Sequence, residues 1–264
     1  MKTAEATASA VPKVKFGVSS FEGDFHILHD NLETGRKGGQ SWAHLIYGAY
    51  PGLADALKGG EPTMEAERRF FSAVHTKEEA LFEATAARFQ DEWDAINDDA
   101  MRALSEIVEQ DWPKGTHVSG YVSLIPFGPR TINERSFRIY YKATAQNMKA
   151  TVVHELLHFI YFEKWKAVFP ETNEREFNRP YLVWQLSEMV TEILLNDARL
   201  QKVFAHRFHT YPFYQKMQID GKPLLSYLQG FYDGREDFAD FLKKSLDFVK
   251  EHQEEINRNF NSSG

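Results

Sequence analysis

The 264-residue chain contains no cysteine. Disulfide frameworks, cysteine-ligated zinc, iron–sulfur clusters and thiol nucleophiles are therefore excluded. Any bound metal has to be held by histidine and carboxylate side chains. A chain of this length buries a core large enough to fold without cross-links, so the lack of cysteine does not argue against a stable globular protein.

Long apolar runs are also missing. Glu, Lys or His interrupts the most apolar segments, and none reaches the roughly 20 apolar residues of a membrane-spanning helix. The segment Met1–Thr7 contains no apolar run that could form the centre of a signal peptide. We therefore expect a soluble, cytoplasmic protein that has no membrane partner.

The chain has no excess of positive charge, since 31 Lys and Arg stand against 38 Asp and Glu for a net charge of −7. Nucleic acid binding relies on a positively charged surface, so we do not expect a nucleic acid partner. Aromatic residues are plentiful instead, at 14% of the chain. Together with 42% hydrophobic residues they are typical of a globular protein with a well-filled core, and they leave the oligomeric state open.

The order of the predicted elements indicates an α+β fold. Residues 1–15 are predicted to be a flexible tail, and residues 16–115 a mainly helical region. Within that region the pattern predicts a helix near Ser41–Tyr47 and helical structure from Thr63 to Asp111, in which Thr76–Glu79 has the form of a capping box at a helix start.

After residue 115 strands come first and helices follow. Val118–Ile125 and Ser136–Tyr141 are rich in β-branched and aromatic residues, which predicts two strands. Three helices are then expected, at Thr144–Val168, Pro180–Phe204 and Gly234–Asn257. We expect residues 116–264 to form a catalytic region in which a small mixed sheet packs on the first of these helices. This region is either separate or one compact unit with residues 16–115.

The first of these helices carries the pattern His-Glu-x-x-His, at residues 154–158. One helical turn places the imidazoles of His154 and His158 on the same face, where they can bind a single Zn²⁺. Glu155 then lies beside the metal, where it can accept a proton from bound water. Apolar residues flank the motif, and burying these polar side chains is costly unless they have partners. The motif therefore predicts a zinc site, and the alternative is a hydrogen-bonded pair of core histidines.

A tetrahedral zinc ion needs a further protein ligand, and the next predicted helix supplies candidates. Glu188 and Glu192 are four residues apart on one face of the otherwise apolar segment Leu182–Leu194. A second possibility is a glutamate of the loop before this helix. The loop is charged and bounded by prolines, which favours a solvated segment for its glutamates Glu171, Glu174 and Glu176.

The order of the two motifs, His-Glu-x-x-His on one helix and Glu-x-x-x-Glu on the next, resembles that of the gluzincins. These are the thermolysin-like and aminopeptidase-like zinc metallopeptidases. The resemblance implies a zincin-like fold and one zinc per chain. The implied ligands are His154, His158 and Glu188, the implied general base is Glu155, and Glu192 is the implied acceptor for the free N–H of a ligating histidine.

The resulting prediction is peptide hydrolysis by a zinc metallopeptidase that acts on a peptide or protein substrate. The alternative is a binding or scaffold protein that keeps a zincin fold and a structural metal without activity, and a closed site with four protein ligands would favour it.

An edge strand before the zinc helix would suit an endopeptidase, which pairs with the substrate backbone. An aminopeptidase needs a carboxylate for the free amine, for which Glu134 is the candidate. The Gly-x-Met-Glu-Asn signature of exopeptidases is absent, which favours the endopeptidase.

Two other groups of polar residues are weaker candidates. His209 and Tyr211, which follow the Glu188 helix, are possible hydrogen-bond donors to an oxyanion, although such residues near a helix end are often ordinary surface. His26 and His29 form a second close pair of histidines. No carboxylate lies near them at ligand spacing, so we interpret them as a half-buried structural pair.

Overall fold

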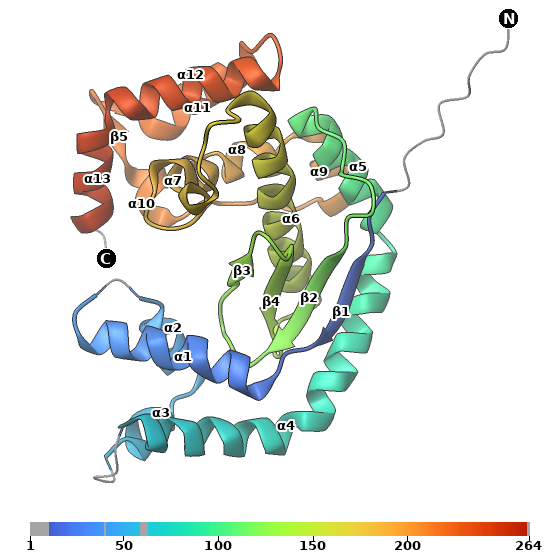
Figure 1. Cartoon of the computed structure of the whole chain (residues 1–264), viewed down its shortest axis with the longest axis vertical. Coiled ribbons are helices and arrows are strands. Elements are labelled where there is room, and N and C mark those ends of the chain that lie inside the picture. Colours follow the sequence, from blue (N-terminus) through green and yellow to red (C-terminus); the bar gives the residue numbers. More distant parts are fainter. Residues whose placement is uncertain (1–10, 40, 59–62, 263–264) are drawn as a thin grey trace, which may run out of the picture.

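A four-stranded sheet lies at the centre of the protein, which the computed structural model describes at residues 11–39, 41–58 and 63–262 (Figure 1). The strand order is β1-β2-β4-β3, with the bounds β1 Val14–Val18, β2 Val118–Ser123, β3 Arg130–Thr131 and β4 Ser136–Tyr140. β1, β2 and β4 run parallel, whereas the short β3 pairs antiparallel with β4 and forms one edge. The predicted α+β class with a small mixed sheet is confirmed, and β2 and β4 are the two predicted strands.

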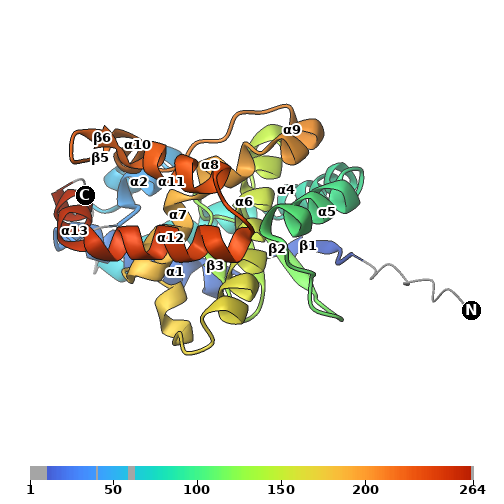
Figure 2. The same cartoon turned by 90° about the horizontal axis from the view of Figure 1, so that it is seen from above.

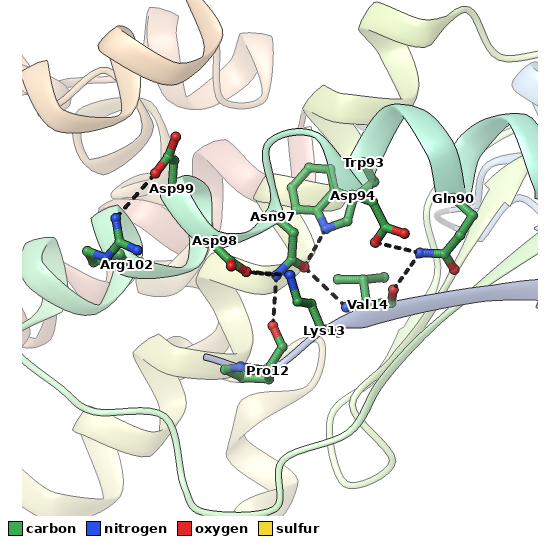
Figure 3. A network of polar contacts seen from close by, with 10 residues as sticks. All are labelled: Pro12, Lys13, Val14, Gln90, Trp93, Asp94, Asn97, Asp98, Asp99 and Arg102. Atoms are coloured by element: carbon green, nitrogen blue, oxygen red, sulfur yellow. Dashed lines mark hydrogen bonds and ion pairs between the residues drawn. The ribbon is translucent and has the colours of Figure 1, made fainter. Parts of the chain in front are cut away.

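The first strand corrects the prediction of a flexible tail over residues 1–15. Residues 1–10 lie outside the described residues, but Val14 is fully buried and begins β1. Asn97 anchors this strand (Figure 3): its side-chain oxygen accepts a hydrogen bond from the Val14 backbone at 3.2 Å, and its amide donates to the Pro12 carbonyl at 3.0 Å. The N-terminal region thus contributes a strand to the same sheet as the later strands.

Helices form most of the remaining N-terminal region, and their bounds are α1 Phe21–Arg36, α2 Ala43–Ala49, α3 Leu53–Ala56, α4 Thr63–Asp94 and α5 Asn97–Val108. The predicted helices near Ser41–Tyr47 and over Thr63–Asp111 are confirmed as α2 and as α4 with α5, whereas α1 is not among the predicted elements. Thr76–Glu79 is not a helix start, because it lies inside α4. Figure 1 shows α4 running beside β1 and then turning toward α1 and α3, so it joins the sheet to the N-terminal helices.

The predicted helix over Thr144–Val168 is confirmed as α6, Ala145–Val168. The Thr144 side chain caps its first turn by accepting a hydrogen bond from the Asn147 backbone at 3.2 Å. Most residues from Val152 to Phe162 are buried, because α6 packs against β4 and is also in contact with α4, α5, α8 and α12 (Figure 1). The His-Glu-x-x-His motif therefore lies on a helix that has little contact with solvent.

The C-terminal part is mainly helical. Its elements are η1 Glu174–Phe177, α7 Leu182–Met189, α8 Thr191–Leu195, α9 Ala198–Phe204, α10 Pro212–Lys216, β5 Gln218–Ile219, β6 Lys222–Pro223, α11 Leu224–Asp233, α12 Phe238–Glu251 and α13 Gln253–Ser262. α12 and α11 pack against α7 and α8, respectively (Figure 2). α12 and α13 correspond to the predicted helix Gly234–Asn257, and α11 is not among the predicted elements. None of the described helices combines the length and the apolar character that crossing a bilayer requires.

The prediction of one helix over Pro180–Phe204 is wrong, because α7, α8 and α9 are separate. In a continuous helix the carbonyl of Glu188 would accept a hydrogen bond from the backbone four residues later. Here the hydroxyls of Thr191 and Thr210 both donate to this carbonyl at 2.7 Å. This competition ends α7 just after Glu188 and ties that residue to the segment that follows α9.

Candidate metal centre

The motif on α6 and the end of α7 bring three possible metal ligands together. Nε2 of His154 lies 3.1 Å from Nε2 of His158, as expected for residues one helical turn apart. The carboxylate oxygens of Glu188 lie 3.5 Å from Nε2 of His154 and 3.4 Å from Nε2 of His158. One ligand atom from each residue lies within 4.8 Å of the other two, so this largely buried group can hold a metal ion.

Two buried atoms of this group have no hydrogen-bond partner. They are Nδ1 of His158 and Oε2 of Glu188, whose side chain is only 1% exposed. A buried carboxylate oxygen without a donor is costly, and Oε2 faces Nε2 of His154 across the group. A metal ion held by the three side chains would supply the missing partner of Oε2 of Glu188. The residues therefore fit a bound metal.

The surroundings keep two of the three ligands in the form that a metal binds, which is neutral imidazole and ionised carboxylate. Burial lowers the pKa of His158 to about 3, and the positive charge of Arg130 adds to this effect. Burial alone would raise the pKa of Glu188, but the positive charge of Arg130 helps to hold it well below its ordinary value. His154 differs: burial alone would lower its pKa, but the negative charges of Glu188 and Glu155 outweigh burial and raise it.

Glu155 lies beside this group on α6 and is 3% exposed. Burial raises its pKa, and the attraction of Arg130 opposes that effect. The loop between β2 and β3 approaches the carboxylate closely, since a Cβ atom on Gly128 would lie 3.3 Å from Oε1 of Glu155. The missing side chain at Gly128 therefore leaves space next to the predicted general base.

Arg130 is a residue of this site that sequence reasoning missed. It belongs to the edge strand β3, and its side chain is 11% exposed. Its Nη2 donates to Oε1 of Glu188 at 2.8 Å, and its Nη1 donates to Oε2 of Glu155 at 3.3 Å. In the sequence it is a single basic residue after a segment that contains Gly and Pro. That signal does not predict contact with carboxylates from two helices.

A cavity of about 540 Å³ opens beside the motif. His154 and Glu155 lie on its wall, and most of the other lining residues are apolar or aromatic. The aromatic and histidine side chains that line it are Trp42, Phe127, His206, Phe208, His209 and Tyr211. The ring of Trp42 stacks on Tyr211 with 5.7 Å between the ring centroids. Trp42 precedes α2 and Tyr211 precedes α10, so the cavity joins distant parts of the chain.

Both candidate oxyanion donors, His209 and Tyr211, therefore line the cavity. Burial raises the pKa of Tyr211, and the negative charges of Glu188 and Glu155 raise it further, so the phenol keeps its proton and is a donor. His209 is more exposed, and its Nδ1 lies 2.9 Å from Nε2 of Gln215. Their role toward an oxyanion stays a prediction.

Glu192 faces this same segment. Its Oε2 accepts hydrogen bonds from the Thr210 backbone at 3.1 Å and from Nε2 of Gln215 at 2.7 Å, and its Oε1 lies 3.6 Å from Nδ1 of His209. Nδ1 of His158 has no partner, so Glu192 does not accept a hydrogen bond from that ring. The role of Glu192 toward a ligating histidine stays a prediction, and the contacts that its carboxylate makes hold the cavity wall.

Replacing Glu192 with alanine is expected to leave zinc affinity within about threefold of the wild type, because its carboxylate is held by Thr210 and Gln215 and accepts no hydrogen bond from His158. The effect expected for an outer-shell partner would be a loss of about 10–100-fold. Glu188→Ala is the matched comparison, and it should remove zinc binding. Chelator titrations measure both variants, and an equal loss in the two would place Glu192 on the metal.

The other candidates lie elsewhere. In the loop before α7, Glu174 is exposed and pairs with Lys166 at 2.7 Å, and the loop contributes no residue to the metal-holding group among the described residues. Nδ1 of His29 lies 2.6 Å from the fully buried carboxylate of Glu67 on α4. His29 thus has a carboxylate partner from a distant helix, which the local sequence does not reveal.

Comparisons of the chain with protein-family models, with curated proteins and with solved structures found no match.

Proposed function

We propose that the protein is a zinc-dependent peptidase with a zincin-like fold and a gluzincin-like set of ligands. The observation that carries this proposal is the convergence of His154, His158 and Glu188 beside a cavity, with Glu155 next to them on the cavity wall. Two imidazole nitrogens and one carboxylate oxygen are the protein ligands of one class of catalytic zinc sites. We infer one zinc per chain.

The number of ligands supports a catalytic site over a structural one. Structural zinc sites are closed by four protein ligands, whereas three ligands leave one position for water or substrate. The sequence offers Glu192 as the candidate for a fourth ligand that would close the site. Its carboxylate is instead held by Thr210 and Gln215. The alternative of a scaffold protein with a structural metal therefore lacks its fourth ligand among the described residues.

In this proposal the protein's own side chains transfer the proton of the attacking water and orient the substrate. Zinc, when bound, would polarise a peptide carbonyl and lower the pKa of water. Glu155 accepts the proton of the water that attacks the carbonyl carbon, and it returns this proton to the amine nitrogen as the C–N bond breaks. Gly128 leaves space beside Oε1 of Glu155 for that water. Tyr211 and His209 donate hydrogen bonds to the carbonyl oxygen.

The substrate in this proposal is an extended peptide. β3 is an edge strand that carries Arg130 into the site, and the preceding Pro129 lines the cavity, so a peptide can pair with this edge beside the motif. Glu155 is the single acidic residue among the described residues that line the cavity. Glu134 lies in the turn between β3 and β4, with its Oε2 3.4 Å from the Ser136 hydroxyl. The cavity wall thus offers no second carboxylate for a free amine, which favours an endopeptidase.

A peptide cleavage assay tests the proposal. The zinc-loaded protein should cut internal bonds of a peptide mixture at the same positions whether the N-termini are free or acetylated, and a chelator should stop the reaction. Mass spectrometry identifies the products. Cleavage confined to the residue next to a free N-terminus would contradict the endopeptidase, and a zinc-containing protein that cuts no peptide would favour the scaffold.

A further inference from the structure

Arg130 lies in an unusual place for a cation, because it joins the proposed third metal ligand to the proposed general base. Its guanidinium donates to Glu188 at 2.8 Å and to Glu155 at 3.3 Å. The three side chains are 11%, 1% and 4% exposed, respectively, so solvent screens these ion pairs little. The contact is bridging, with one nitrogen directed at each carboxylate.

The charges of the site explain what the guanidinium does when no metal is bound. Glu155 and Glu188 are two buried carboxylates, and Arg130 is the cation that contacts both. A buried charge that loses its partner is strongly destabilising. Arg130 is therefore the counter-charge of both buried carboxylates.

A metal ion would use one of the same carboxylates. Oε1 of Glu188 lies 2.8 Å from Nη2 of Arg130 and 3.4 Å from Nε2 of His158, so the guanidinium reaches the edge of the ligand group. A guanidinium and a divalent cation at this range repel each other, and the repulsion is strong where water is excluded. Binding of the metal thus weakens an ion pair that stabilises the metal-free protein.

We propose that Arg130 is a positioning residue that sets the metal affinity of the site, because it is the cation that pairs with Glu188 in the metal-free protein and its charge repels the metal. This inference rests on the metal site of the proposed function. In this role Arg130 stabilises the metal-free site, where one cation offsets part of the charge of two carboxylates, and it makes the bound metal easier to exchange. An alternative role, in which Arg130 only holds Glu188 in place for the metal, has the opposite consequence for affinity.

Zinc affinity of Arg130→Gln tests the proposal, measured by competition with a chromophoric zinc chelator. Removing the positive charge is expected to strengthen zinc binding by about tenfold or more. Arg130→Lys keeps the positive charge that repels the metal, so its zinc affinity should stay within about threefold of the wild type. Arg135→Gln is the matched control, because Arg135 follows closely in the chain and pairs with Glu163 at 2.7 Å outside the metal group. It should leave the affinity unchanged.

Thermal melting of the metal-free proteins gives a second readout. Arg130→Gln should lower the melting temperature more than Arg135→Gln does, and saturating zinc should narrow this difference.

Zinc binding by Arg130→Gln that equals or falls below that of the wild type would overturn the role of Arg130 and leave the zinc site standing. A wild type that binds no zinc would overturn the site itself, and this inference with it. If Arg130→Gln does not fold, the zinc affinity of Arg130→Lys decides. An affinity more than threefold weaker than that of the wild type, with Arg135→Gln unchanged, would overturn the proposal. An affinity within threefold of the wild type would support it.

Discussion

Replacing Glu155 with glutamine is expected to lower kcat for peptide hydrolysis by about 100- to 10,000-fold while the fold and the bound zinc remain. Glutamine has the size of glutamate and can still accept a hydrogen bond from Arg130, but its amide cannot accept the proton of water. Glu155 is not part of the group that can hold the metal, so zinc content should not change. Steady-state kinetics on a cleaved peptide, together with zinc analysis of the same sample, measure both quantities.

Glu163→Gln is the control for this variant. Glu163 lies on the same helix and pairs with Arg135 at 2.7 Å, away from the residues that line the cavity. It should keep the wild-type rate. Equal rates in Glu155→Gln and the wild type would remove Glu155 from the mechanism, and an equal loss in both variants would show that the effect is a general property of α6.

The second large effect is expected for His154→Ala, which should lose zinc and all zinc-dependent activity. His154 is one of the three proposed ligands, and loss of a ligand weakens binding by more than the 10–100-fold that an outer-shell change costs. Its side chain is 24% exposed, so truncation leaves a smaller defect in the core than truncation of the buried His158. Metal analysis after dialysis against a weak chelator measures the loss.

His206→Ala is the matched variant, since this histidine also lines the cavity and its Nδ1 lies 2.9 Å from Nε2 of Gln146. It should retain one zinc per chain, because it is outside the metal-holding group. Full zinc content in His154→Ala would mean that the metal binds elsewhere or that the group is a set of structural polar contacts.

Local patterns account for the parts of the fold that the sequence predicts. α6 is recognisable because Thr144 can cap its first turn and Pro170 follows soon after its end. The convergence of His154 and His158 then follows from helix geometry alone. Glu188 required a further assumption, namely that the next helix returns across the first, and that assumption is confirmed.

Contacts between distant segments account for what the sequence does not predict. β1 is a short strand whose identity depends on pairing with β2 and on the side chain of Asn97, neither of which is a local signal. The break after Glu188 depends on a hydroxyl from Thr210, which approaches from a later segment. Arg130 reaches the site because β3 pairs with β4 and places its side chain beside α6 and α7. Such contacts are set by tertiary packing, which a pattern of residue types does not contain.

The central claim is that His154, His158 and Glu188 hold one zinc ion, and a crystal structure with data collected on both sides of the zinc absorption edge tests it most directly. The account predicts one anomalous peak per chain, bonded to Nε2 of both histidines and to a carboxylate oxygen of Glu188, with an open position facing the cavity that His154 and Glu155 line. A crystal of the zinc-incubated protein with no anomalous peak among these three side chains, and Arg130 still paired with Glu188, would contradict the account.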